Sequence, residues 1–306
     1  MSHNTSSNFK SHLDCIPCLV RQAQEAVVSA TPEIALREQA LREAVDTLAG
    51  MDWHLSPPAL AQHMHRRIRD VVHNSDPYAA VKHRLNQRAK ELYPVWHKRF
   101  REKFSPQEAA VRLAIVGNLL DVGAKTQLTD DAVLVALEEA LTAPLVGSMN
   151  LLFQAIGQSR HLLYLADNAG EIVFDRDLLA LLPLGKFTVV VRGAPVLNDA
   201  LMEDAEGAGL ADFCELVDNG SDAPGTVLED CSLDFQKRFE AADLIIAKGQ
   251  GNYETLAGAN KHIFFLLKVK CPIVAEALQC PCGSLVLNEH QPPFPANGNA
   301  PTPILP

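Results

Sequence analysis

The chain has 306 residues, of which 47% are hydrophobic and 21% are charged, and its formal net charge is −10 at pH 7. This length and composition are typical of a globular protein with room for two domains. Proteins that bind nucleic acid usually carry a clustered basic face, so an acidic chain argues against a nucleic-acid partner.

The amino-terminal residues 1–10 are polar and lack the apolar core of a signal peptide. No segment reaches the uninterrupted apolar length that spans a bilayer, so we expect no membrane partner. Seven cysteines, an odd number, are more typical of a reducing cytosol than of a secreted disulfide framework. We expect a cytoplasmic protein, and the sequence does not indicate its oligomeric state.

The first half of the chain has helical periodicity throughout. Ser56-Pro57, Asp76-Pro77 and Ser105-Pro106 each place a capping side chain before a proline at the first helical position. These signals predict helices that begin near residues 57, 77 and 106. Further helices are predicted over 15–30, 33–49, 131–141 and 149–156, so the segment 1–158 is expected to form an all-helical domain.

After residue 160 the periodicity changes. Short apolar runs typical of buried strands alternate with helical stretches, which predicts a mainly parallel sheet flanked by helices over residues 159–290. The expected strands are 162–166, 187–191, 213–217, 244–247 and 263–267, and the expected helices include 172–182 and 200–208. The tail, residues 291–306, is rich in proline and is expected to have no fixed fold.

A polar cluster follows each of four predicted strands. The carboxyl ends of parallel strands meet at one edge of a sheet, where open α/β sheets bind their ligands, so the four clusters are expected to lie together. Asn-Gly and Asp-Asn-Ala-Gly are also ordinary turn sequences, but the fourfold recurrence favours a site over isolated turns. The clusters are residues 167–171, 192–199, 218–226 and 248–254.

The residue types in these clusters suit a divalent metal and a phosphate. Aspartate and asparagine oxygens are ligands for Mg²⁺ or Mn²⁺, so Asp167, Asn168 and Asp199 are the expected metal ligands. Lys248 supplies a positive charge for a phosphoryl oxygen, and Gly249 and Gly251 allow backbone N–H groups to approach an anion. Together these features indicate phosphoryl chemistry.

The same motifs resemble those of the damage-control phosphatases, a family catalogued as domain of unknown function 89. The resemblance rests on Asp-Asn-Ala-Gly-Glu, Arg-Gly-Ala-Pro-Val-Leu-Asn-Asp-Ala, Gly-Ser-Asp-Ala-Pro-Gly-Thr and Lys-Gly-Gln-Gly-Asn-Tyr-Glu, in this order, with Gly-Asn-Leu-Leu-Asp at 117–121 and Lys-Cys-Pro at 270–272. It implies an α/β fold, in which an all-helical amino-terminal domain packs on a Rossmann-like α/β/α domain with a mainly parallel sheet.

The resemblance also implies a metal-dependent hydrolase of a small phosphorylated metabolite such as a sugar phosphate. The metal is expected to be Mg²⁺ or Mn²⁺, with Co²⁺ or Ni²⁺ as further options. By motif position Asp167, Asn168 and Asp199 would ligate it and Lys248 would hold the phosphate. The other polar and glycine residues of the motifs would bind substrate or phosphate: Asn118, Asp121, Arg192, Asn198, Ser221, Asp222, Gly249, Gly251, Asn252 and Glu254.

Two mechanisms are compatible with these residues. In the first, which we favour, water attacks phosphorus in line, with Asp167 or Glu171 as the general base and Lys248 offsetting the charge of the transferred group. In the second, Asp167 is a nucleophile and forms an aspartyl phosphate.

Cys15 and Cys18 form a Cys-x-x-Cys pair at the start of the first predicted helix. This spacing suits half of a zinc site, which Cys280 and Cys282 would have to complete, or a thiol redox couple, or two ordinary thiols. An amino-terminal pair of this kind also resembles the prokaryotic branch of the family. The basic stretch His65–Arg69 is interpreted as a solvated helix face.

Two other functions remain as alternatives. An S-adenosylmethionine-dependent carboxyl methyltransferase would use a similar sheet, but it normally needs a glycine-rich turn after the first strand, where this chain offers one glycine beside acidic and amide groups. A non-catalytic protein that binds a phosphometabolite would keep the same pocket without turnover.

Overall fold

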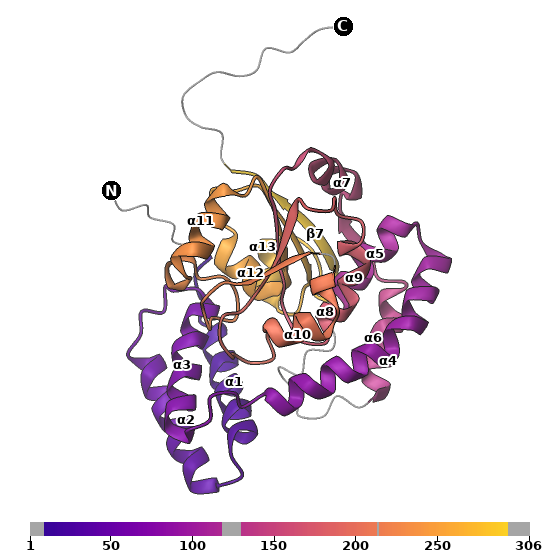
Figure 1. Ribbon diagram of the computed structural model, residues 1–306. Coiled ribbons are helices and arrows are strands. Elements are labelled where there is room, and N and C mark those ends of the chain that lie inside the picture. Colours follow the sequence, from indigo (N-terminus) through magenta and orange to yellow (C-terminus); the bar gives the residue numbers. More distant parts are fainter. Residues whose placement is uncertain (1–8, 118–129, 213, 293–306) are drawn as a thin grey trace, which may run out of the picture.

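The computed structural model describes residues 9–117, 130–212 and 214–292. Its first part is helical, and its second part alternates strands with shorter helices (Figure 1). The helices are α1 (Cys15–Ala30), α2 (Ile34–Ala49), α3 (Pro57–Val72), α4 (Ala79–Lys103), α5 (Pro106–Val116), α6 (Asp130–Ala140), α7 (Met149–Gln158), α8 (Glu171–Phe174), α9 (Arg176–Leu179), α10 (Met202–Gly207), α11 (Leu233–Ala241), α12 (Gly249–Leu256) and α13 (Pro272–Ala277).

Seven strands form one sheet in the order β1-β7-β6-β5-β2-β3-β4. All neighbouring pairs are parallel except β6 and β7, which run antiparallel. The expected mainly parallel sheet is therefore confirmed. The strands are β1 (Leu145–Gly147), β2 (Leu162–Leu165), β3 (Phe187–Val191), β4 (Glu215–Asp218), β5 (Leu244–Lys248), β6 (Ile263–Lys268) and β7 (Leu285–His290).

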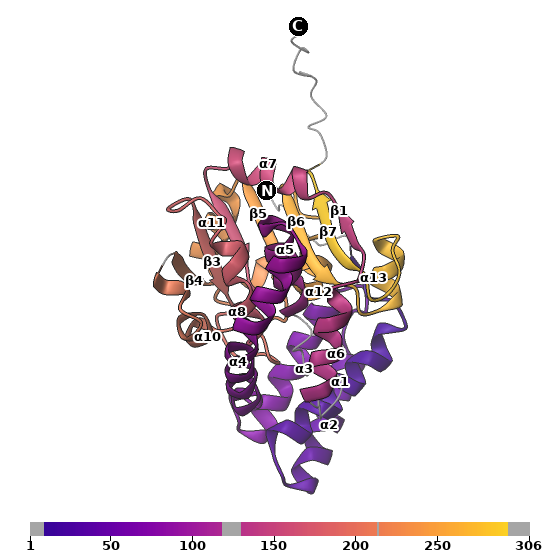
Figure 2. The ribbon, with the colours of Figure 1, turned by 90° about the vertical axis from the view of Figure 1, so that its right-hand side faces the viewer.

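The sheet is covered on both faces, which is why its central strands are mostly apolar. Alternate residues of one strand point to opposite faces: Leu162 and Tyr164 enter the core shared with α4–α9, whereas Leu163 and Leu165 enter the core shared with α11–α13. The domain thus has the three α/β/α layers that were expected (Figure 2).

Helices α1, α2 and α3 form a separate bundle with its own apolar core, which includes Leu19, Leu60 and Met64. The bundle lies below the carboxyl edge of the sheet in Figures 1 and 2, and α3 contacts α12. Helices α4 and α5, in contrast, join the apolar core on one face of the sheet, where α5 contacts β6 and β7. The helical first half therefore contributes to two cores.

The predicted starts of three helices agree only in part with the structure. The Ser105 hydroxyl accepts a hydrogen bond from the Glu108 N–H at 3.2 Å, and α5 begins at Pro106 as predicted. Helix α3 begins at Pro57, although Ser56 makes no side-chain cap. The helix expected near residue 77 begins at Ala79.

Two strands were not predicted. Strand β1 lies inside the segment expected to be all-helical, so that expectation is wrong at Leu145–Gly147. Three residues are too few to show a periodicity. Strand β7 was assigned to no element, and it joins the sheet between β1 and β6. No helix in the described ranges is long and apolar enough to cross a membrane.

Candidate active site

The site lies where the strand order reverses. From β2 the chain continues through β3 and β4 on one side of the sheet, and through β5 and β6 on the other. A crevice forms at such a switch point, outside the carboxyl ends of the strands. Asp167 follows β2, and Lys248 ends β5 immediately before α12.

The structure brings Asp167, Asn168 and Asp199 together, although they come from loops after different strands. Asn168 and Asp199 face each other in an isolated antiparallel bridge. The Ala200 N–H donates to the Asp167 carbonyl at 2.8 Å, and the Ala169 N–H donates to the Asn198 carbonyl at 2.8 Å. Backbone pairing therefore fixes the spacing of the three expected ligands before any ion binds.

Gly249 lets the Asp167 carboxylate lie against the start of α12. A Cβ atom at this position would be 1.8 Å from Asp167 Oδ2, and the backbone has φ of +80°, which favours glycine. The amino-terminal end of a helix also carries partial positive charge, which favours a carboxylate or phosphate nearby. The glycine predicted for backbone approach to an anion thus lies beside an anionic side chain of the protein.

The expected ligands form part of a buried group of carboxylates that contacts one buried arginine. Arg192, which is 2% exposed, donates from Nε to Asp199 Oδ2 at 2.7 Å, and its NH2 group lies 3.9 Å from Asp167 Oδ1. Burial, Glu171 and Asp199 still raise the pKa of Asp167 well above its usual range, against the opposing effect of Arg192 and Lys270. A further cation would stabilise this group of carboxylates.

The donor set fits a hard divalent cation. Asp167, Asn168 and Asp199 are 8%, 6% and 3% exposed, and all three line one cavity. In the part of the chain that the structure describes, no group of three or more His, Cys, Asp or Glu side chains is placed to hold a metal. An ion here would use an amide oxygen and water beside two carboxylates, a coordination that suits Mg²⁺ better than zinc.

Lys248 lies behind the expected ligands. Its ammonium group is fully buried and donates to Glu171 Oε1 and Asp175 Oδ1, each at 2.6 Å. Burial alone would lower the pKa of Lys248, but these two carboxylates raise it above its usual value. The Asn168 amide joins this network to the ligands, since Nδ2 donates to Asp167 Oδ2 at 2.9 Å and to Glu171 Oε2 at 3.2 Å.

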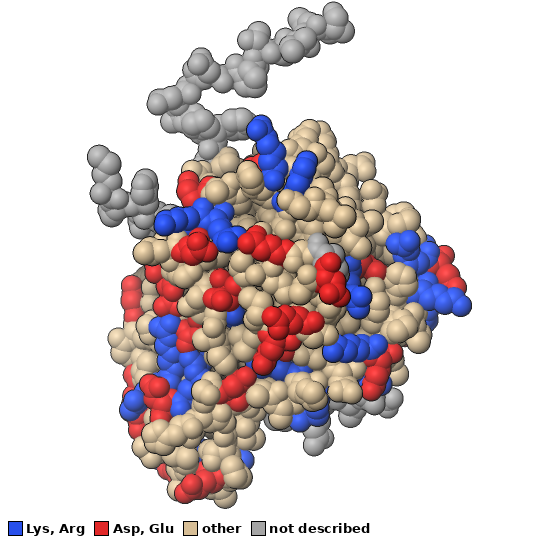
Figure 3. Space-filling view, in the orientation of Figure 1, with Lys and Arg blue, Asp and Glu red and all other residues tan. Residues whose placement is uncertain are grey.

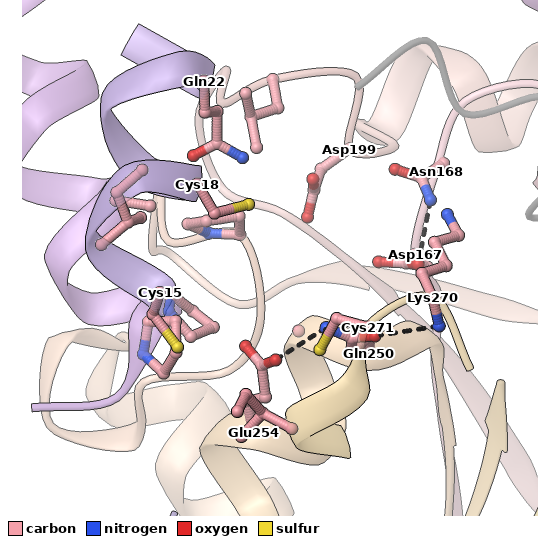
Figure 4. A pocket seen from close by; sticks show the side chains of 18 of the residues that line it. Cys15, Cys18, Gln22, Asp167, Asn168, Asp199, Gln250, Glu254, Lys270 and Cys271 are labelled. Carbon is pink, nitrogen blue, oxygen red and sulfur yellow. Dashed lines mark hydrogen bonds between the residues drawn. The ribbon is translucent and has the colours of Figure 1, made fainter. Parts of the chain in front are cut away.

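Lys270 is a cation of the cavity that the sequence interpretation did not assign. It follows β6, its side chain is exposed, and it lines the cavity and lowers the pKa of Asp167. Figure 4 shows its side chain extending toward Asp167 and Asn168. The motif Lys270-Cys271-Pro272 was visible in the sequence, but its distance along the chain from the other motifs gave no sign of this contact.

The loop after β4 contacts the helical bundle. Asp222, expected to bind substrate, pairs with Arg66 and Arg69 of α3 and accepts from Gln62 Nε2 at 2.7 Å. Basic side chains over α3 border acidic ones on the face shown in Figure 3. The interpretation of His65–Arg69 as a solvated face is therefore wrong: His65 is 3% exposed, and the two arginines join the bundle to the loop.

Three other expected substrate residues are almost fully buried. Ser221 donates to Asp230 Oδ2 at 2.7 Å. Asn252 accepts from Thr226 Oγ1 at 2.7 Å and donates to the Lys248 carbonyl at 2.8 Å. Asn198 lines the cavity beside the ligands. Asn118 and Asp121 lie outside the described residues.

The cavity measures about 380 Å³ and lies between the sheet edge and the helical bundle. One wall carries the expected metal ligands, Lys270 and Glu254, and the opposite wall comes from α1 and α3 (Figure 4). This second wall is mainly apolar, with Leu19, Pro58 and Ala61. Gly251 also lines the cavity, and a Cβ there would be 2.2 Å from the Pro224 carbonyl.

Cys15 and Cys18 lie in the first turn of α1 and line the same cavity. Burial raises the pKa of both thiols, whereas redox-active cysteines usually have a lowered pKa. Within the described ranges these thiols belong to no cluster of three or more metal-binding side chains, so the zinc interpretation finds no support. A redox role stays a prediction.

Known proteins match this chain over most of its length. The family model described as damage-control phosphatase ARMT1-like domain matches residues 11–286. A damage-control phosphatase of Pyrococcus horikoshii is 33% identical over 285 residues, which cover 91% of this chain and 97% of the relative. One from Archaeoglobus fulgidus is 33% identical over 280 residues, covering 89% and 96%. The crystal structure of a DUF89 family protein from Pyrococcus horikoshii superposes with a TM-score of 0.81 at 30% identity, covering 92% of this chain and 99% of that one.

Proposed function

Because this chain belongs to the damage-control phosphatase family, we propose that it hydrolyses a small phosphorylated metabolite with a divalent metal ion held by Asp167, Asn168 and Asp199. The names of its relatives support phosphatase activity. The observation that carries the proposal is the meeting of two buried acidic side chains and an amide at the switch point, where all three line one cavity.

A divalent ion in this place would supply positive charge to a phosphoryl group during in-line displacement. Lys270 extends into the cavity and is placed to bind a phosphate oxygen, whereas Lys248 is buried and stabilises Glu171 and Asp175. Arg192 holds Asp199 in position through a 2.7 Å hydrogen bond. We therefore propose that Lys270 binds phosphate directly and that Lys248 acts by positioning the carboxylates.

Of the two expected general bases, Asp167 has the better access. It lines the cavity, whereas the Glu171 side chain is 1% exposed and engaged with Lys248. We favour direct attack by water, with Asp167 accepting its proton. A cavity of about 380 Å³ suits a small metabolite, since ligand pockets start at about 300 Å³.

The test is phosphate release from a panel of phosphomonoesters with Mg²⁺, Mn²⁺, Co²⁺ or Ni²⁺, after removal of bound metal by a chelator. We expect activity only with added metal, and Asp167→Asn should lower kcat by roughly 10²- to 10³-fold. The matched control is Asp234→Asn, because Asp234 is 78% exposed and is not among the residues that line the cavity. Equal activity in the Asp167 variant would contradict the metal assignment. Protection by S-adenosylmethionine without phosphate release would favour the methyltransferase.

A further inference from the structure

Glu254 is a buried carboxyl group at the cavity that the proposed mechanism leaves without a role. It lies on α12, is 7% exposed, and lines the same cavity as Asp167, Asn168 and Asp199. Figure 4 shows its carboxyl group pointing into the cavity, across from Asp199. The sequence predicted only that it binds substrate.

The position of this carboxyl group is fixed by Gln250. Gln250 Nε2 donates to Glu254 Oε1 at 2.8 Å, and Gln250 Oε1 accepts from the Lys270 N–H at 3.4 Å. Side chains on a helix point toward its amino terminus, which for α12 is Gly249, the residue against Asp167. The carboxyl group is therefore directed toward the end of α12 that lies against Asp167.

Among the described residues, Glu254 raises the pKa of three thiols and one phenol near it. They are the thiols of Cys15 and Cys18 from α1, the thiol of Cys271 at the start of α13, and the phenol of the neighbouring Tyr253. Among the described residues no Lys, Arg or His pairs with this carboxylate. Burial raises the pKa of Glu254 to about 7, although the hydrogen bond from Gln250 opposes the rise. A proton donor of this kind suits acid catalysis near neutral pH.

We propose that Glu254 is the general acid that protonates the leaving group of the phosphoester. The inference rests on the proposed phosphatase function. When the bond between phosphorus and the ester oxygen breaks, its electron pair stays on that oxygen, which takes the proton from the Glu254 carboxyl group. Water forms the new bond to phosphorus and loses its proton to Asp167. Solvent then returns a proton to Glu254 and removes one from Asp167, so the reaction yields an alcohol and inorganic phosphate.

This role explains the two unlike walls of the cavity. The phosphate would lie beside Asp199 and Lys270, and the organic part of the substrate would lie between Glu254 and the apolar wall, where Leu19, Cys18 and Ala61 carry no charge. The Cys-x-x-Cys pair then contributes neutral thiols that help to keep water and counter-charge away from Glu254.

The test compares phenyl phosphate with 4-nitrophenyl phosphate, which differ little in size but greatly in the basicity of the leaving group. Glu254→Gln keeps the hydrogen-bonding shape and removes the proton. We expect it to lower kcat for phenyl phosphate by roughly 10²-fold and to leave 4-nitrophenyl phosphate nearly unchanged, because nitrophenolate needs no proton to depart. The unmodified protein should also lose activity on phenyl phosphate above about pH 7, where Glu254 loses its proton, and this loss should be absent in the variant.

Two further variants complete the experiment. Glu254→Asp retains an acid and should keep part of the activity on phenyl phosphate, whereas Glu203→Gln, an exposed change on α10, should behave as the unmodified protein. If Glu254→Gln slows both esters equally, or neither, the general-acid role is wrong while the phosphatase function stands. If the unmodified protein hydrolyses neither ester nor any other phosphomonoester with any of the metals, the proposed function itself fails.

Discussion

Two lysines near Asp167 have the same charge and opposite surroundings. Lys248 is fully buried between Glu171 and Asp175, with a hydrogen bond of 2.6 Å to each. Lys270 is exposed at the cavity, where its positive charge lowers the pKa of Asp167. From the sequence, Lys248 was expected to hold the phosphate. We infer from this comparison that a buried ammonium group paired with two carboxylates stabilises the site. An ammonium group that faces the cavity can instead bind a ligand.

Replacing the buried Lys248 should have the largest effect on stability. Lys248→Met would leave two carboxylates uncompensated in the interior, and breaking a buried pair in this way typically costs about 3–5 kcal/mol of unfolding free energy. Urea unfolding measures this directly. The control is Lys98→Met, whose side chain is 76% exposed and 3.8 Å from Glu102, and which should leave stability unchanged. Equal unfolding free energies of the two variants would show that buried Lys248 contributes no more to stability than an exposed lysine does.

Glu254 offers a smaller effect that depends on pH. Its pKa is raised from 4.5 to about 7, so the folded protein holds this proton to higher pH than the unfolded chain does. Its contribution to stability is therefore complete below pH 4.5 and is lost as pH rises through about 7. Each unit of pKa shift corresponds to about 1.4 kcal/mol, so Glu254→Gln should be more stable than the unmodified protein by up to about 3 kcal/mol at pH 8.

The same comparison at about pH 4 provides the control, because the carboxyl group is then protonated in both states and the difference should vanish. Unfolding by urea at both pH values would measure it. An unmodified protein that gains stability between pH 4.5 and 7 relative to the Gln variant would show that Glu254 is charged in the folded state.

Replacing Lys270, which faces the cavity, should affect substrate binding. Lys270→Ala should raise KM for phosphomonoesters by roughly 10- to 100-fold, since removing a hydrogen bond to a charged group costs about 1.5–3 kcal/mol, and should leave the unfolding free energy nearly unchanged. Steady-state kinetics and urea unfolding on the same preparation separate the two effects. A large loss of stability with unchanged KM would reverse the proposed roles of Lys270 and Lys248.

The sequence predicted the fold where local pattern and burial agree. Strands β2, β3, β5 and β6 are short runs of mostly apolar residues, so their type and parallel arrangement could be predicted. Strand β1 is too short to carry a pattern, and β7 carries polar residues in its second half, where three side chains are only partly buried. Neither could be recognised without the strands beside it.

The site was predictable as a set of strand ends, because parallel topology brings Asp167, Asn168 and Asp199 to one edge. The ion pairs around the site could not be predicted. In the sequence Asp175 is an ordinary residue of a predicted helix, but in the structure it forms an ion pair with Lys248. Arg66 and Arg69 were expected to be solvated, but both form ion pairs with Asp222. Ion pairs between distant segments depend on tertiary contacts that no local spacing records.

The most direct measurement of the central claim is calorimetric titration of Mn²⁺ into the metal-free protein and its variants. We predict one site per chain, lost in Asp199→Asn because one of the two carboxylate ligands is gone, and retained in Lys270→Ala because a charged lysine side chain does not ligate a metal cation. Unaltered Mn²⁺ binding by the Asp199 variant, with loss in the Lys270 variant, would contradict the metal site at Asp167, Asn168 and Asp199.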